Sequence, residues 1–445
     1  MTGLFDMLPP KQPMHNSVRQ PLDAPRATLL LEDMAALEGL APLIKQHEAF
    51  FAWLVEGSPF LARLMRRYPE VVLALADTGP GAYLGALLTA LAADMEAAQD
   101  KDAAMALLRH ARNRAALAIA LADLADVWDV ETVTDYLTRL ADTAVRCGLD
   151  FLLREAVAAK RLTAFSRDGL VVLALGKHGG QELNYSSDID FVVYYTPNAL
   201  PLAEGQDTRK FHITLVRELT ALLQNVTADG FVFRVDLRLR PDPGATQITI
   251  SVDAALAYYE SMGQNWERAV YIKARPIAGD LAAGQKFLEN LRPYIWRRYF
   301  DFAAIDDVHS MKRQIHAVRG HAEIAAQGHN VKLGRGGIRE IEFFVQTQQL
   351  IAGGRDADLR GRRTVEMLAM LAEKNWISAA TAEKLTASYY YLRRIEHRLQ
   401  MRLDEQTQTL PKGDDGFAAF ARFAGYEDAA AFTGEMTAHL SGVTD

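Results

Sequence analysis

The spacing of apolar residues changes twice along the chain, and this change limits the folds that the sequence can adopt. At residues 28–163 apolar side chains recur three or four positions apart, as in Leu61, Leu64 and Tyr68, which predicts helices. The centre has short apolar runs bounded by Gly and Pro, which predict strands. From about Ala303 helical spacing returns. We therefore expect an α+β fold that is mostly α, with a small sheet between helical ends.

The length of 445 residues is too great for one ordinary core, because single domains usually hold about 100–200 residues. We predict a loose leader, a helical domain, a central domain with the sheet and a second helical domain, at residues 1–27, 28–163, 164–300 and 301–445. The leader lacks the basic start and apolar stretch of a signal peptide, and no apolar segment is long enough to cross a bilayer. We therefore expect a cytoplasmic protein without a membrane partner.

The charge balance and the cysteine content narrow the classes of function. The formal net charge is −7, whereas a general nucleic-acid binder usually carries a basic surplus. We therefore expect no nucleic-acid partner. Cys147 is the only cysteine, so no internal disulfide can form, and this argues against a secreted, disulfide-stapled fold.

The central region has the pattern of short strands around one helix. Residues 170–175 form a short apolar run, typical of a buried strand, and a polar loop with glycines follows at 176–187. Residues 231–240 alternate apolar and polar side chains, so a strand there places its polar side chains on one face. Further elements are expected as strands at 188–195, 246–252 and 270–275 and as a helix at 208–226.

Two aspartates at the start of the second strand carry the predicted chemistry. Asp188 and Asp190 stand two positions apart, so their carboxylates point to the same face of the strand. Such like charges repel unless a cation lies between them, and Mg²⁺ (or Mn²⁺) takes hard oxygen ligands and bridges to phosphate oxygens. Asp236, on the polar face of the later strand, is the candidate third carboxylate of a two-metal arrangement. The sequence therefore predicts these three aspartates as metal ligands and catalytic residues.

The loop before the two aspartates predicts the phosphate contacts. Glycine lets backbone N–H groups come close to a phosphate, and serine and lysine side chains add donors. Phosphoryl transfer needs mainly positioning and neutralised charge, which such a loop supplies. The predicted nucleotide- and phosphate-binding residues are Gly176, Lys177, Gly179, Gly180, Ser186 and Ser187.

The order of strand, glycine-containing loop, Asp-x-Asp and third aspartate resembles the DNA polymerase β-like nucleotidyltransferase superfamily. The resemblance implies a nucleotidyltransferase core with a small mixed sheet, flanked by helical domains. One position departs from the pattern, because Lys177 stands where Gly or Ser is usual. Gly179, Gly180 or Ser187 is the alternative source of the phosphate contact expected there.

Longer motifs narrow the resemblance. The stretches GGQELNYSSDID, RVDLRLRP, KLGRGGIREIEF and RRIEHRLQ, at 179–190, 234–241, 332–343 and 393–400, are similar, in this order, to bifunctional glutamine synthetase adenylyltransferase/adenylyl-removing enzymes. The similarity covers most of the chain. Glu340 stands where the adenylyl-transferring half of these enzymes usually has Asp, so the chain resembles their N-terminal, adenylyl-removing half.

This resemblance implies a reaction in which inorganic phosphate attacks the adenylyl-tyrosine of adenylylated glutamine synthetase, forming ADP and freeing the tyrosine. Phosphate is already an anion and needs no strong general base, but it needs cations to approach another phosphate. Arg238 and Arg240 are the candidates, and the alternative is a solvated or salt-bridged strand face. The resemblance also implies control by a PII signalling protein.

Two other functions remain open. The same aspartates would serve an adenylyl- or uridylyl-transferase that works forward from a nucleoside triphosphate. A helical module that binds nitrogen-signalling proteins without catalysis would not need them.

Three features of the C-terminal part have structural and functional alternatives. The turn at 334–337 either binds an anion at a helix start or is a tight interdomain turn. Glu340 and Glu342 either reach the metal site or pair with arginines. At 388–403 we expect a helix with apolar residues on one face and arginines on the wet face.

Overall fold

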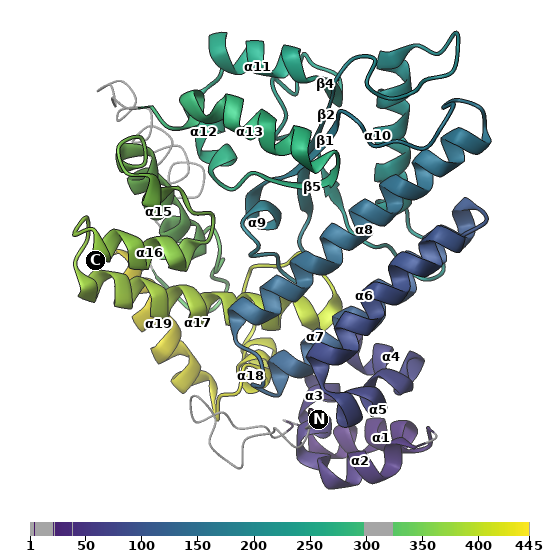
Figure 1. Cartoon of the computed structure of the whole chain (residues 1–445). Coiled ribbons are helices and arrows are strands. Elements are labelled where there is room, and N and C mark those ends of the chain that lie inside the picture. Colours follow the sequence, from purple (N-terminus) through teal and green to yellow (C-terminus); the bar gives the residue numbers. More distant parts are fainter. Residues whose placement is uncertain (1–3, 5–20, 22, 38, 298–323, 445) are drawn as a thin grey trace.

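The computed structural model describes residues 4, 21, 23–37, 39–297 and 324–444 (Figure 1). In these ranges the chain is mostly helical with one small mixed sheet, which confirms the predicted fold class. Most of the predicted leader lies outside the described residues, although the first helix begins within it at Ala24, and the predicted boundary at 300/301 also lies outside them. The division into domains stays a prediction.

The first part of the chain is a stack of helices that ends in three long ones, α6, α7 and α8, which lie against one another (Figure 1). Helix starts follow from local chemistry: the Asp100 and Asp129 carboxylates accept hydrogen bonds from the N–H groups of Ala103 and Thr132. Proline occupies the start of three of the helices, where its missing N–H has no consequence. The bounds are α1 Ala24–Ala35, α2 Leu40–Gln46, α3 Glu48–Gly57, α4 Pro59–Arg67, α5 Pro69–Thr78, α6 Pro80–Ala97, α7 Lys101–Leu124 and α8 Val130–Ala158.

The central sheet has the strand order β3-β2-β1-β5, and β4 also pairs with β2. β1 is antiparallel to β2 and β5, whereas β2 is parallel to β3 and β4. The predicted strands at 170–175 and 188–195 are thereby confirmed. The bounds are β1 Leu170–Ala174, β2 Ile189–Tyr195, β3 Val235–Asp236, β4 Thr249–Ser251 and β5 Arg275–Gly279.

Alternate residues of the strands enter two different cores. Val172 and Val193 belong to the large core shared with α7, α8 and α10, while Val171 and Val192 face a second core with α11, α12 and α13. The sheet is therefore covered on both faces. The helices of this part are α9 Gly176–Gly179, α10 Thr208–Gln224, α11 Val252–Ser261, α12 Asn265–Ile272 and α13 Leu281–Ile295.

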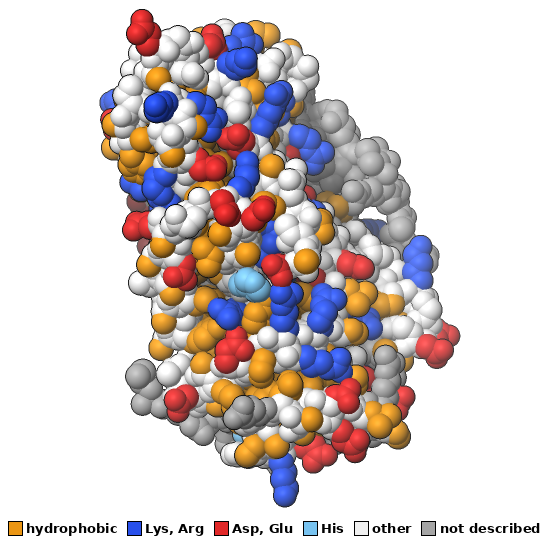
Figure 2. Space-filling model, turned by 90° about the vertical axis from the view of Figure 1, so that its right-hand side faces the viewer, with side chains coloured by type: hydrophobic (Ala, Val, Ile, Leu, Met, Phe, Trp, Pro, Cys, Tyr) orange, Lys and Arg blue, Asp and Glu red, His pale blue; other side chains and the backbone are white. Residues whose placement is uncertain are grey.

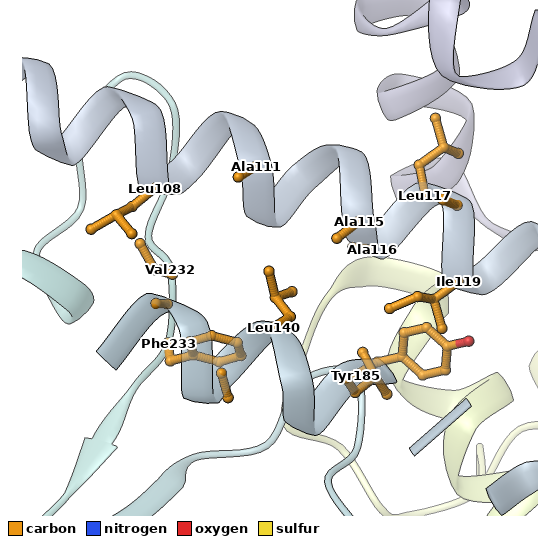
Figure 3. Close-up of a cluster of buried hydrophobic side chains, with 14 of the residues drawn as sticks. Leu108, Ala111, Ala115, Ala116, Leu117, Ile119, Leu140, Tyr185, Val232 and Phe233 are labelled. Carbon is orange, nitrogen blue, oxygen red and sulfur yellow. The ribbon is translucent and has the colours of Figure 1, made fainter. Parts of the chain in front are cut away.

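The large core reaches the loop that precedes β2. Figure 3 shows α7 above this loop, with Ile119 over the Tyr185 ring and Leu108 facing Val232. Burying a side chain of this size contributes about 1.5–3 kcal/mol. The N-terminal helices therefore support the loop from one side.

The C-terminal part packs its helices around α17, which crosses the molecule and also contacts α4 and α8 (Figure 1). Its own core joins Leu392 and Ile395 of α17 to Phe432 and Leu440 of α19. The bounds are α15 Ile338–Ala352, η2 Ala357–Arg360, α16 Thr364–Glu373, α17 Ala379–Leu403, α18 Asp414–Phe423 and α19 Ala429–Thr444.

Charged side chains of both signs share the face of the molecule that Figure 2 shows. The face seen in Figure 2 carries acidic and basic side chains next to one another rather than a field of one sign. Within the described ranges, every helix is too short or too polar to span a membrane.

Two predicted strands were wrong in their extent. The strand at 231–240 is reduced to Val235–Asp236, because the Asp236 carboxylate accepts a hydrogen bond from Arg238 N–H at 2.8 Å and turns the chain away from the ladder. The strand at 270–275 begins only at Arg275. Residues before it are the end of α12, whose start is fixed by the hydrogen bond from Gln264 N–H to the Glu267 carboxylate.

The expectation that arginines fill the wet face of the helix at 388–403 was also wrong. Arg393 and Arg398 of α17 are buried. Arg398 reaches Asp123 of α7 at 2.8 Å, and His397 lies 3.2 Å from the same carboxylate. The helix therefore has an apolar face and a buried ionic face, because it is enclosed on both sides.

The Asp123 carboxylate provides a test of this ionic contact. Burial alone would raise its pKa, but Arg398 and His397 outweigh burial and hold the pKa well below its ordinary value. Ionised Asp123 thus stabilises the fold above about pH 4, and this contribution is lost as the pH falls.

We predict that Asp123→Asn lowers the free energy of unfolding by about 3–5 kcal/mol at pH 7, because Arg398 is left buried without its partner. The difference in unfolding free energy between Asp123→Asn and the unaltered chain should become smaller below about pH 4. Urea unfolding at several pH values measures both effects, with Asp94→Asn, an exposed position on α6, as the control. A difference that is small or constant with pH would contradict this account.

Candidate active site

Asp190 of β2 lies opposite Asp236 of the neighbouring parallel strand β3. Burial raises the pKa of Asp190, and the negative charges of Asp236 and Asp188 raise it further, to about 7. The structure therefore brings the three predicted aspartates within electrostatic reach of one another. This cluster of like charge at one sheet edge is the centre of the candidate site.

The two outer carboxylates are each held by an arginine of the segment around β3. Arg234 Nε donates to Asp188 Oδ1 at 2.7 Å, and Arg238 Nε donates to Asp236 Oδ1 at 3.0 Å. Burial opposes ionisation of Asp236, but the hydrogen bonds from Arg238 outweigh it and lower the Asp236 pKa. Both outer aspartates are therefore held in place by an arginine, and Asp236 is also held as a carboxylate.

The three carboxylates offer the oxygen ligands that a divalent cation takes. In the described ranges no three His, Cys, Asp or Glu side chains are gathered as a metal centre, and the outer two carboxylates accept hydrogen bonds from arginines. Mg²⁺ takes carboxylate oxygens, and its charge would offset the repulsion that raises the pKa of Asp190. Asp188, Asp190 and Asp236 stay the proposed ligands on these grounds.

The glycines of the loop differ in their surroundings. Gly176 has a φ of +54°, and a Cβ added there would lie 2.5 Å from Asp190 Oδ2, so its backbone forms one wall of the site. A Cβ at Gly179 would lie 2.1 Å from the carbonyl oxygen of Lys273, and one at Gly180 would lie 3.0 Å from the Lys273 side chain. The structure thus brings Gly176 to the aspartates and encloses Gly179 and Gly180 against Lys273.

Lys177 points into a buried cluster of charges. Its ammonium lies 3.0 Å from Glu396 Oε2 of α17. Burial lowers the pKa of Lys177 to about 8, although Glu396 acts in the opposite direction. In this arrangement the lysine holds the loop to α17 and does not point to the aspartates.

The two serines have different roles in the structure. Ser186 is buried, its N–H donates to Gln400 Oε1 at 2.9 Å and its hydroxyl donates to the Asp404 carbonyl at 3.1 Å. Ser187 is half-buried, and its hydroxyl has no hydrogen bond to another described residue. Ser187 is therefore the serine with a donor available for a phosphate.

The two arginines predicted to bind phosphate also differ. Arg240 donates to the carbonyl oxygens of Leu237, Pro243 and Gln247 at 2.9–3.0 Å, so it folds its own segment. Arg238 is exposed, and among the described residues its side chain is anchored only to Asp236. Arg238 can thus turn to an anion, whereas Arg240 is committed to the backbone.

The turn at 334–337 is enclosed by protein. α15 begins at Ile338, as predicted. A Cβ at Gly336 would lie 2.0 Å from the carbonyl oxygen of Leu440, and one at Gly337 would lie 2.7 Å from that of Val331. These contacts favour the tight-turn alternative over an anion site.

Glu342 belongs to the buried cluster of charges, with Arg339 at 3.6 Å. Burial opposes its ionisation, but the charge of Lys177 and other nearby cations lowers the pKa of Glu342 to about 2. The structure therefore places this glutamate among cations, of which Lys177 and Lys273 act more strongly than Arg339.

Two cationic residues of the site were missed in the sequence. Arg234 was placed on the polar face but was not chosen, although its spacing from Asp236 put it beside the aspartates. Lys332 lies in another part of the chain, and its charge lowers the pKa of Asp190. Only its place at the head of the third motif could have indicated it.

The Gly176 backbone gives a direct test of the site geometry. We predict that Gly176→Ala lowers the free energy of unfolding by clearly more than the about 1–2 kcal/mol expected from a left-handed φ alone, because the added Cβ also meets the Asp190 carboxylate. Gly205→Ala is the matched control, since Gly205 has a φ of +83° and open space around it. Equal losses of unfolding free energy in the two variants would show that a Cβ at position 176 does not meet the Asp190 carboxylate.

Comparison with curated bacterial proteins gives relatives over nearly the whole chain. The chain is 50% identical over 436 residues to the bifunctional glutamine synthetase adenylyltransferase/adenylyl-removing enzyme of Mesorhizobium japonicum, covering 94% of this chain and 44% of that protein. The proteins of the same name from Xanthobacter autotrophicus and Brucella suis are 50% and 47% identical over 92% and 93% of this chain. The chain spans less than half the length of these relatives.

Two family models match consecutive parts of the sequence. Residues 309–445 match the model described as GlnD PII-uridylyltransferase. Residues 51–290, which include all three aspartates, match the model described as glutamate-ammonia ligase adenylyltransferase. With more than half of its residues in this second match and the aspartate cluster at its sheet edge, the chain belongs to the glutamate-ammonia ligase adenylyltransferase family.

Proposed function

We propose that the chain removes adenylyl groups from glutamine synthetase by phosphorolysis of adenylyl-tyrosine. The observation that carries the nucleotidyl-transfer part is the register of Asp190 against Asp236, with Asp188 beside them. The substrate is inferred from the family and from the names of the relatives. The direction is inferred from the motif with Glu340, which resembles the adenylyl-removing half.

The proposed reaction forms one phosphorus–oxygen bond and breaks another. An oxygen of inorganic phosphate attacks the phosphorus of the adenylyl group, ADP forms, and the tyrosine oxygen leaves and takes a proton from solvent. A divalent cation held by the three aspartates would neutralise charge on the transferred group. Because the attacking phosphate is already ionised, the site needs cationic side chains more than a general base.

The chain's own residues divide this work. Arg238 turns from Asp236 to the incoming phosphate, which its exposure and single anchor permit. The Ser187 hydroxyl donates to a phosphate oxygen, and the Gly176 backbone sets the position of Asp190. Arg234 fixes the Asp188 carboxylate to the loop, since it donates to Asp188 and to the Ser186 carbonyl oxygen.

The relatives' name combines two activities, so forward adenylyl transfer from ATP is the second candidate. Both directions would use the same aspartates. The match of residues 309–445 to the PII-uridylyltransferase model also supports a PII signalling protein as a partner of this chain.

The first test is whether the purified chain forms ADP from adenylylated glutamine synthetase, Mg²⁺ and phosphate. We predict ADP formation that falls at least about 1,000-fold in Asp190→Asn and in Asp188→Asn, because a ligand carboxylate is lost. Asp253→Asn, at an exposed position of α11, is the control and should keep full activity. A different result would assign the opposite direction to this chain. It is AMP transfer from ATP onto unmodified synthetase, with no ADP formed from the adenylylated synthetase.

The second test concerns the phosphate. We predict that Arg238→Gln raises the KM for phosphate about tenfold or more, because a charge-assisted contact to the attacking anion is lost. Arg209→Gln, an exposed position of α10, should leave this KM unchanged. Steady-state rates of ADP formation at varied phosphate measure the effect, and an unchanged KM in Arg238→Gln would assign phosphate binding to other residues.

A further inference from the structure

One face of α17 contacts the segment at 176–188, here called the aspartate loop, at three successive points. Glu396 Oε2 lies 3.0 Å from Lys177 Nζ near the start of the loop. Arg393 donates to the carbonyl oxygen of Glu182 at 2.7 Å and to Asn184 Oδ1 at 2.6 Å in the middle. Gln400 Oε1 accepts the Ser186 N–H at 2.9 Å near the end.

These three residues of α17 form one continuous buried face. Positions 393, 396 and 400 are three and then four apart, which places their side chains above one another on a helix. Their side chains are at most 1% exposed. The motif RRIEHRLQ, for which the proposed reaction has no use, therefore supplies the surface on which the aspartate loop lies.

The contact between Glu396 and Lys177 is connected to Asp190 through the backbone of Gly176. Lys177, held by Glu396, follows Gly176 directly in the chain. The Gly176 backbone is close enough to the Asp190 carboxylate that a Cβ there would lie 2.5 Å from Oδ2. Leu175 N–H also donates to the Asp190 carbonyl oxygen at 2.8 Å. A shift of Lys177 would thus move the wall against which Asp190 lies.

The contact between Gln400 and Ser186 is connected to Asp188 through Arg234. Ser186, whose N–H is held by Gln400, accepts a hydrogen bond at its carbonyl oxygen from Arg234. The same guanidinium donates through Nε to Asp188 Oδ1 at 2.7 Å. The side chain of Asp188 is therefore tied to α17 through two residues.

We propose that Glu396 and Gln400 are positioning residues, which act through Lys177 and Ser186 to set the spacing of the Asp190 and Asp188 carboxylates. A ligand pair must be held closely for a metal site to form, and the groups behind the ligands decide how well it is held. The inference rests on the proposed metal-dependent function of the aspartates.

If Glu396 and Gln400 had a purely structural role, their replacement would lower stability without weakening metal binding by the folded chain. Replacing one partner of a buried ion pair destabilises a protein wherever the pair lies, so lost stability alone does not identify positioning. Gln400→Met removes a hydrogen-bond acceptor with little change of side-chain size and leaves no unpaired charge. It therefore keeps the inference testable where Glu396→Gln alters folding.

The experiment measures Mn²⁺ affinity by calorimetry on the full chain, at a temperature where urea and thermal unfolding show each variant to be folded. We expect the dissociation constant for Mn²⁺ to rise about tenfold or more in Glu396→Gln and in Gln400→Met. Backbone amides of the aspartate loop should exchange hydrogen faster in both variants. Glu383→Gln makes the same chemical change at an exposed position of α17 and should match the unaltered chain.

The outcomes separate the inference from the proposed function. Unchanged Mn²⁺ affinity in both folded variants would overturn the positioning role, and so would an unaltered chain that binds no Mn²⁺. Weaker Mn²⁺ binding in the variants, together with no ADP formation by the unaltered chain, would support the positioning role and overturn only the proposed phosphorolysis.

Discussion

Repulsion between carboxylates at one sheet edge is the constraint on which the site depends. The parallel register of β2 and β3 sets Asp190 opposite Asp236, and Asp188 adds a third negative charge. Repulsion of this kind destabilises the folded chain unless cations are near. The surrounding structure provides them, as Arg234 and Arg238 hold the outer carboxylates and the charge of Lys332 acts on Asp190. A divalent cation is the further partner that this arrangement favours.

Buried ionic contacts join the helical parts of the chain to this site. Asp123 of α7 and Arg398 of α17 meet beneath Tyr185, whose hydroxyl also donates to Asp123. Lys273 and Glu182 form a second buried pair beside Gly180. Such pairs contribute little net stability compared with an apolar core, but each partner has only one favourable arrangement. These two pairs therefore hold the aspartate loop to α7, through Tyr185, and to the end of α12, through Glu182.

The sequence was sufficient for those parts of the fold that local pattern determines. The helices at both ends, β1, β2 and the start of α15 lie where apolar spacing and turn residues placed them. The strand at 231–240 was overestimated because alternation does not reveal that the Asp236 side chain binds the backbone of Arg238. The prediction of a solvent-exposed face on α17 was wrong. Polar residues that pair inside the protein recur along a helix at the same spacing as polar residues that face water.

In the site too, residues that are close in the chain could be predicted, whereas partners that are distant in the chain could not. Asp188, Asp190 and Gly176 could be chosen from the motif, since they are close in the chain. The partner of Lys177 could not, because Glu396 lies 219 positions further along. Separation in sequence also concealed Lys332, which lies far along the chain from the aspartates. Long-range pairing is set by how helices pack on the sheet, and local spacing and motifs do not reveal it at the level of single contacts.

The most direct test of the central claim is the location of bound metal. Crystals soaked with Mn²⁺ would show it by anomalous scattering. The account predicts a peak between Asp188, Asp190 and Asp236, with metal–oxygen distances of about 2.0–2.3 Å, and with Arg238 turned away from Asp236. Mn²⁺ bound elsewhere, or no peak at a concentration that supports activity, would contradict the claim that these aspartates form the metal site.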